Sequence, residues 1–126
     1  MNERLTEQKS IYLQISEMIE TDILREILLE EEQVPSTNDL ARSCSINPAT
    51  AAKGINLLVA EGVLYKRRGI GMFVSPGAAK LVRKKRQGEF YQKFVRPMAR
   101  EGKSLGLSGT ELLDMVKQAV EEEENT

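Results

Sequence analysis

The residues with the clearest chemical potential form a basic run beside two glycines. Lys66, Arg67 and Arg68 are consecutive cations, and Gly69 and Gly71 follow them with one residue between. Cations attract phosphate groups, and glycine lets a backbone adopt positive φ and approach another surface closely. The pattern favours contact with a sugar-phosphate backbone over the alternative of a solvated hairpin with ordinary turn glycines. The glycine pair is not a dinucleotide-binding fingerprint, because it lacks a third glycine and a following helix.

A second group of small and polar residues lies along one side of a helix expected from about residue 48. Ala51, Ile55 and Leu58 recur at helical spacing and form the core side of that helix. The other side carries Asn47, Ala49, Thr50, Ala52 and Lys53. A slim helix of this kind can lie deep in the major groove of DNA, with its N-terminal residues at the base edges.

The polar members of this group each have more than one reasonable role. Thr50 can hydrogen-bond a phosphate or a base, and Lys53 can reach a guanine or a phosphate. Asn47 can contact DNA, or it can cap the helix, with Pro48 at the first turn, where a missing N–H costs no hydrogen bond. The sequence leaves these alternatives open.

Periodicity and capping signals predict the elements that position these residues. Isoleucines and Met18 at three- and four-residue steps predict a helix over about 11–28, with Ser10 as its N-cap. Ser36 and Asp39 resemble a capping box that opens a second, short helix. Two short helices joined by a tight turn after a longer one make a helix-turn-helix.

Strand-forming residues complete the predicted fold class. Residues 63–74 favour a β-hairpin around the two glycines. A helix-turn-helix followed by a basic hairpin is a winged helix, so the expected fold is mainly α with a small β-hairpin. Ser75, Pro76 and Gly77 then break the chain. We therefore expect a winged helix-turn-helix DNA-binding domain at residues 1–76 and a helical dimerisation tail at 77–126.

The tail is predicted to contain two helical segments. Apolar spacing predicts a helix over roughly 78–101, which Gly88 weakens and Pro97 should kink or break. Ser108 and Glu111 form a capping box that opens a final amphipathic helix.

The tail carries more large apolar groups than so short a segment can easily bury alone. These groups are Phe90, Tyr91, Phe94, Met98, Leu112, Leu113 and Val116. We expect them to form a homodimer interface, with an internal core as the alternative. The basic run Arg83, Lys84, Lys85 and Arg86 could extend a DNA footprint, but a solvated helix face is the preferred interpretation.

The net charge of −1 conceals a strong segregation of charge. Residues 1–33 carry nine acidic and three basic groups, and residues 104–126 carry six acidic groups and one basic group. Residues 34–103 carry fourteen basic and four acidic groups, which gives this segment a net charge of +10. Because phosphates respond to local potential, the middle segment favours double-stranded DNA as a partner despite the acidic pI.

Composition also excludes several classes of protein. The chain has one cysteine and no histidine, which excludes His-dependent catalytic triads and argues against a zinc or other metal site. Cys44 is interpreted as a small buried hydrophobe. No apolar run has the length that spans a bilayer, and we expect a cytoplasmic protein without enzymatic activity or cofactor. Nothing in the sequence identifies a small-molecule effector.

The ordered motifs at residues 34–41, 46–53 and 61–74 resemble the GntR family of bacterial regulators, and residues 11–15 match its usual start. The resemblance is continuous over about residues 10–75. The short tail resembles the YtrA subfamily, which carries a small helical dimerisation module in place of a large effector-binding domain.

This resemblance implies a homodimer on a palindromic operator, usually acting as a repressor and often on neighbouring transporter genes. Carried over by position, the DNA-contacting residues are Asn38, Asn47, Ala49, Thr50, Lys53, Arg68, Gly69 and Gly71. Asn38 departs from the family pattern, because many members have a DNA-contacting arginine there. The preferred function is sequence-specific DNA binding in transcription. The alternative is a winged-helix protein-interaction module without sequence-specific DNA binding.

Overall fold

A computed structural model of the chain describes residues 9–126. Its contacts divide the chain into two compact units, Met1–Lys85 and Arg86–Thr126. The division lies later than the boundary predicted between residues 76 and 77. The reason is that Ala78 and Val82, beyond the predicted break, are fully buried in the core of the first unit.

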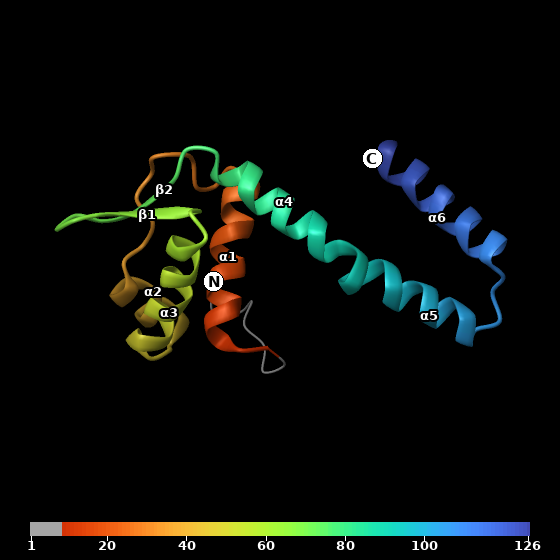
Figure 1. The fold of residues 1–126 in the computed structure, drawn as a ribbon, viewed down its shortest axis with the longest axis horizontal. Coiled ribbons are helices and arrows are strands. Elements are labelled where there is room, and N and C mark those ends of the chain that lie inside the picture. Colours follow the sequence, from red (N-terminus) through yellow and green to blue (C-terminus); the bar gives the residue numbers. More distant parts are fainter. Residues whose placement is uncertain (1–8) are drawn as a thin grey trace. The chain divides into compact units, whose positions relative to one another are not determined.

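Three helices form the body of the first unit (Figure 1): α1 (Ile11–Leu24), α2 (Thr37–Cys44) and α3 (Pro48–Ala60). Helix α1 ends before the predicted residue 28, because Glu26 takes a positive φ of 60° and turns the chain. Ile27, which the periodicity placed on the core side, is therefore exposed.

The capping predictions are confirmed at two of the three helices. Ser36 Oγ accepts a hydrogen bond from the Asp39 N–H at 3.0 Å, and Asn47 Oδ1 accepts one from the Ala49 N–H at 2.8 Å. Ser10 lies at the N-cap position of α1, but its side chain makes no capping hydrogen bond. Hydrogen bonding of the Asp39 carboxyl itself with Ser36 holds the pKa of that carboxyl below its ordinary value, which favours a negative charge in the first turn of α2.

The predicted wing is an antiparallel hairpin of β1 (Leu64–Arg67) and β2 (Gly71–Val74), with Leu64 opposite Val74. Residues 31–34 add a third segment along β2, which the sequence analysis did not predict. Val34 donates its N–H to the Met72 carbonyl at 2.9 Å, and Glu31 donates to the Val74 carbonyl at 2.8 Å. A run of Glu and Gln has low strand propensity, so hydrogen bonding to β2, and not the local sequence, holds these residues along the strand.

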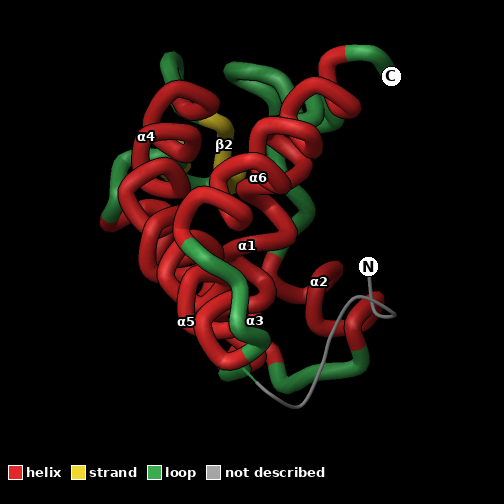
Figure 2. Tube along the Cα trace, turned by 90° about the vertical axis from the view of Figure 1, so that its right-hand side faces the viewer, coloured by secondary structure: helices red, strands yellow, loops and turns green. Residues whose placement is uncertain are grey.

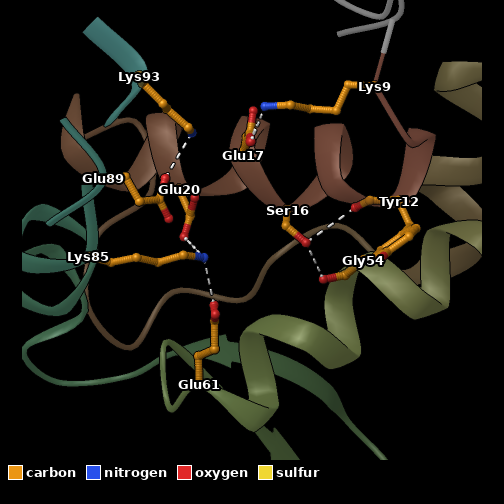
Figure 3. A network of polar contacts seen from close by, with 10 residues as sticks. All are labelled: Lys9, Tyr12, Ser16, Glu17, Glu20, Gly54, Glu61, Lys85, Glu89 and Lys93. Carbon is orange, nitrogen blue, oxygen red and sulfur yellow. Dashed lines mark hydrogen bonds and ion pairs between the residues drawn. The ribbon is translucent and has the colours of Figure 1, made fainter. Parts of the chain in front are cut away.

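Helices α1 and α3 are in close contact at Gly54. A β-carbon at this position would lie 2.7 Å from the Tyr12 carbonyl oxygen and 3.0 Å from the Ile15 side chain. Ser16 reinforces the contact by donating a buried hydrogen bond to the Gly54 carbonyl at 2.7 Å (Figure 3). The glycine therefore determines how closely α3 packs on α1.

Ion pairs of Lys85, one of them with a buried carboxylate, tie the middle of α4 (Ala78–Phe90) to the rest of the first unit. Lys85 Nζ lies 3.0 Å from the buried carboxylate of Glu20 on α1 and 3.0 Å from the carboxylate of Glu61 at the end of α3 (Figure 3). Burial alone lowers the pKa of Lys85, but the two hydrogen bonds outweigh it and raise that pKa above its ordinary value. Within the basic run of α4, this lysine is thus an internal contact and not a solvated cation.

In the second unit the backbone stays helical through Pro97. A π-helical stretch, η2 (Tyr91–Val95), follows α4 and leads directly into α5 (Arg96–Ser104). Of the predicted kink or break at Pro97, the structure shows no break, and the backbone changes from α to π geometry just before the proline. A proline inside a helix removes a hydrogen-bond donor and crowds the preceding turn, and a wider π turn just before it accommodates both effects.

The last helix, α6 (Gly109–Glu124), begins at the predicted capping box. The Glu111 N–H donates to Ser108 Oγ at 3.1 Å, and the Ser108 N–H donates to Glu111 Oε1 at 3.0 Å. Figure 2 shows the helices in red and strand β2 of the wing in yellow. No helix within residues 9–126 is long and apolar enough to cross a membrane.

We predict that Gly54→Ala lowers the free energy of unfolding by about 1–3 kcal/mol, because its methyl group would collide with backbone that cannot move without separating α1 from α3. Gly88→Ala is the matched control, since nothing lies within 4 Å of that position in α4. The control should be stabilised by up to about 1 kcal/mol through helix propensity alone. Urea unfolding that gives equal stabilities for both variants would contradict the close contact.

Candidate nucleic-acid interface

The first half of α3 presents the side chains that the sequence analysis assigned to DNA. Asn47, Ala49 and Lys53 are exposed, and Thr50 and Ala52 are half-buried. The opposite side of the helix is core, with Ala51, Ile55 and Leu58 fully buried. The predicted orientation of α3 is thus confirmed. Of the two roles considered for Asn47, the structure shows the cap, and its contact with DNA stays a prediction.

Helix α2 adds Asn38 and a cation that the sequence analysis did not single out. Asn38 is exposed in the first turn of α2. Arg42 lies one turn later on the same side, and its guanidinium pairs with the Asp39 carboxylate at 2.6 Å. The positive charge of Arg42 beside Asn38 is therefore partly neutralised by Asp39. Because the ion pair of Arg42 with Asp39 is exposed, it contributes little to the stability of the fold.

The tip of the wing is a tight turn that requires one of its two glycines. The Ile70 N–H donates to the Arg67 carbonyl at 3.0 Å and closes the turn. Gly69, the third residue of this turn, has a φ of 77°, as a type II turn requires, and nothing lies within 4 Å of the place a β-carbon would occupy. Backbone at Gly69 is thus open to another molecule.

Gly71 has a different reason to be glycine. A β-carbon there would lie 2.5 Å from the Gln33 side-chain nitrogen, which donates to the Ile70 carbonyl at 3.0 Å. The φ of 147° at Gly71 also disfavours other residues. The space beside Gly71 is therefore filled by the protein's own chain, and a contact of Gly71 with DNA stays a prediction without support from this geometry.

The three consecutive cations of the wing are not equivalent. The Arg67 guanidinium lies 4.5 Å from the centre of the Phe73 ring and donates to the Tyr65 hydroxyl at 3.1 Å. It also pairs weakly with Glu31 at 3.4 Å. Lys66 and Arg68 are exposed and form no ion pair within residues 9–126. Arg67 therefore stabilises the wing itself, while Lys66 and Arg68 keep their charge available to a partner.

The predicted interface residues of the second unit fall into two groups. Phe90, Tyr91, Phe94, Met98 and Leu113 are exposed, with Phe94 at 62% and Leu113 at 71%. Leu112 and Val116 are half-buried, and Leu112 packs beside Gly102 within the unit. Three further apolar residues of the second unit are exposed but were not among the predicted interface residues: Leu105, Met115 and Val120. Helical spacing from Leu112 and Val116 could have identified the last two.

Comparison with known proteins identifies this arrangement. Residues 11–74 match the bacterial regulatory proteins of the gntR family. The chain is also similar to the HTH-type transcriptional regulator YhcF of Bacillus subtilis, with 30% identity over 123 residues that cover 96% of this chain and 98% of YhcF. The chain belongs to the gntR family.

Solved structures agree with this assignment. A GntR-family transcriptional regulator from Bacteroides thetaiotaomicron is 33% identical, with a TM-score of 0.71 over 90% of this chain and 98% of that one. The AraR DNA-binding domain in complex with operator ORX1 is 32% identical, with a TM-score of 0.52 over 57% of this chain and 88% of that one. This gntR-family chain is a DNA-binding transcriptional regulator and not an enzyme. The interaction-module alternative is correspondingly disfavoured.

We predict that Arg68→Ala weakens DNA binding without lowering the melting temperature, because the side chain is exposed and forms no ion pair. If Arg68 contacts a phosphate, the slope of log affinity against log salt should fall by about 0.9 for each phosphate that is no longer neutralised. Arg67→Ala is the matched variant, and it should lower the melting temperature while leaving DNA binding close to that of the wild type. It should lower wing stability by about 0.5–1 kcal/mol through loss of its ring contact. The measurement is a binding titration across a salt series with parallel thermal melts. Equal affinities together with equal slopes for wild type and Arg68→Ala would show that Arg68 does not contact DNA.

Proposed function

We propose that this regulator is a repressor that binds a palindromic operator as a homodimer, in the manner of the YtrA subfamily. The observation that carries the proposal is the set of large apolar side chains left exposed along η2, α5 and α6. Soluble proteins rarely leave so many exposed together, and a second copy of the same segment would cover them. A two-fold pair would carry two α3 helices and so match a site with two-fold symmetry.

Each subunit would dock α3 in the major groove. Thr50, Ala49 and Asn47 lie on the exposed side of its first turns, where recognition helices of this class contact base edges. Asn38 on α2 and the wing residues Lys66, Arg68 and Gly69 would contact the backbone on either side. The complex of AraR with its operator supports this use of the domain, because the two domains share a fold at 32% identity.

Binding of the dimer to its operator would be enough for repression. A dimer seated on DNA excludes other proteins from the same duplex, and this requires no surface beyond the DNA contacts and the dimer interface. Acting on chromosomal DNA, the protein would work in the cytoplasm. We propose no cofactor and assign no small-molecule effector.

Selection of bound duplexes from a random pool tests the mode of binding. We expect a palindromic consensus whose half-sites are separated by about one helical turn, roughly 10 base pairs or a multiple. Specific binding should be tighter than binding to random duplex by about 10³-fold or more. An unsymmetrical consensus would contradict the homodimer on a palindrome. Absence of any enrichment would favour the protein-interaction alternative.

Sedimentation of point variants tests the homodimer. Phe94→Glu should convert the chain to a monomer at micromolar concentration, because a charge would be buried in an apolar interface. Its own fold should persist, since Phe94 is 62% exposed in the single chain. Gln92→Glu, which adds the same charge at an exposed polar position in the same turn, should stay dimeric. A dimeric Phe94→Glu would place the interface elsewhere. Truncation at Ser75 is a poor test, because it removes the buried Ala78 and Val82.

A further inference from the structure

One DNA-facing cation of α3 is in contact with an aromatic ring of α1. Lys53 Nζ lies 4.1 Å from the centre of the Tyr12 ring. Lys53 is exposed and Tyr12 is half-buried, so the ring is held by the fold while the lysine remains open to a partner. An ammonium over the face of an aromatic ring is attracted by the ring's quadrupole, which favours one position of an otherwise flexible side chain.

The backbone contact between the two helices determines where the ring lies. The missing β-carbon of Gly54 leaves room for the carbonyl oxygen of Tyr12, and Ser16 ties the same turn of α1 to the Gly54 carbonyl. Lys53 directly precedes Gly54 in α3. The pair of Tyr12 and Lys53 therefore lies directly beside the close contact of α1 and α3 at Gly54.

We infer that Tyr12 is a positioning residue that holds the ammonium of Lys53 on the α1 side of α3, where it contacts a DNA phosphate and not a base. The inference rests on the proposed DNA-binding function and deepens it. It also decides between the two roles, guanine or phosphate, that the sequence left open for Lys53.

Two arguments favour the phosphate. Recognition helices contact base edges chiefly through their N-terminal residues, whereas Lys53 lies further along α3 and its ammonium is drawn toward α1. In addition, an ammonium is a compact point charge that binds phosphate without a required direction, while reading guanine depends on alignment with two acceptors. A ring beneath the ammonium leaves its outward N–H groups free for such a contact.

The pairing can be tested first without DNA. The ε-methylene protons of Lys53 should show an upfield ring-current shift in the NMR spectrum of the free full-length protein. The shift should persist in Tyr12→Phe, which keeps the ring, and disappear in Tyr12→Leu, which keeps apolar bulk alone. A spectrum in which Tyr12→Leu leaves the Lys53 resonances unchanged would overturn the inference.

The functional role is tested by a double-mutant cycle on two probes, a duplex enriched from the random pool and a random-sequence duplex. Tyr12→Leu should weaken binding to both by the same factor, about two- to five-fold. Tyr12→Phe should bind as the wild type does. Lys53→Met should weaken both and lower the salt slope by about 0.9 for each phosphate left without its cation. In the Lys53→Met background, Tyr12→Leu should have no further effect.

Each contrary result has a distinct meaning. If Tyr12→Leu weakens binding equally in the presence and absence of Lys53, Tyr12 acts only through the packing of α3, and the inference fails. If either variant weakens binding to the enriched duplex alone, Lys53 reads a base, and the phosphate assignment fails. If the wild type binds neither probe, the proposed function fails, and the inference fails with it. Binding by wild type and Tyr12→Leu with equal affinity would overturn the inference alone.

Discussion

The contact between α1 and α3 at Gly54 is the constraint on which the DNA-facing surface depends. A helix that presents one side to a groove must be held from behind. Here the Tyr12 carbonyl and the Ile15 side chain of α1 lie directly against Gly54 of α3, which has no side chain of its own. The buried hydrogen bond from Ser16 fixes the same turn. This contact determines which residues of α3 face outward and brings the Tyr12 ring beside Lys53.

The basic residues of the chain divide into those that stabilise the fold and those whose charge remains available to a phosphate. Lys85 belongs to the first group, because its ammonium neutralises the buried Glu20 carboxylate and also reaches Glu61. Because the Glu20 carboxylate is buried, loss of the Lys85 ammonium should cost more than loss of an exposed ion pair, even where the net stabilisation by the pair is small. Arg67 likewise lies over the Phe73 ring and donates a hydrogen bond to the Tyr65 hydroxyl. The high local positive charge therefore overstates the number of cations that can meet phosphate.

Helix α4 links the two units and explains why their division is not at the Ser-Pro-Gly break. Its first turns bury Ala78 and Val82 in the core of the first unit, and its last residues belong to the second unit. Beyond it, the π-helical η2 lets the chain pass Pro97 while remaining helical. The second unit leaves most of its large apolar groups exposed, in contrast to the closely packed first unit.

The sequence by itself determined the helix-turn-helix, the hairpin, two of the three predicted N-caps in the first unit and the outward side of α3, because periodicity and capping are local properties of the chain. It could not determine that residues 31–34 would extend along β2, because their backbone is held by a strand far away in the sequence. It also could not separate Arg67 from its neighbours, or Lys85 from the basic run, because a charge is structural or available only according to what packs beside it. The role of Gly54 could not be predicted from the sequence either. In the sequence it is only a glycine that weakens a helix interior. The structure shows that α1 lies so close to it that a β-carbon would collide with Tyr12 and Ile15.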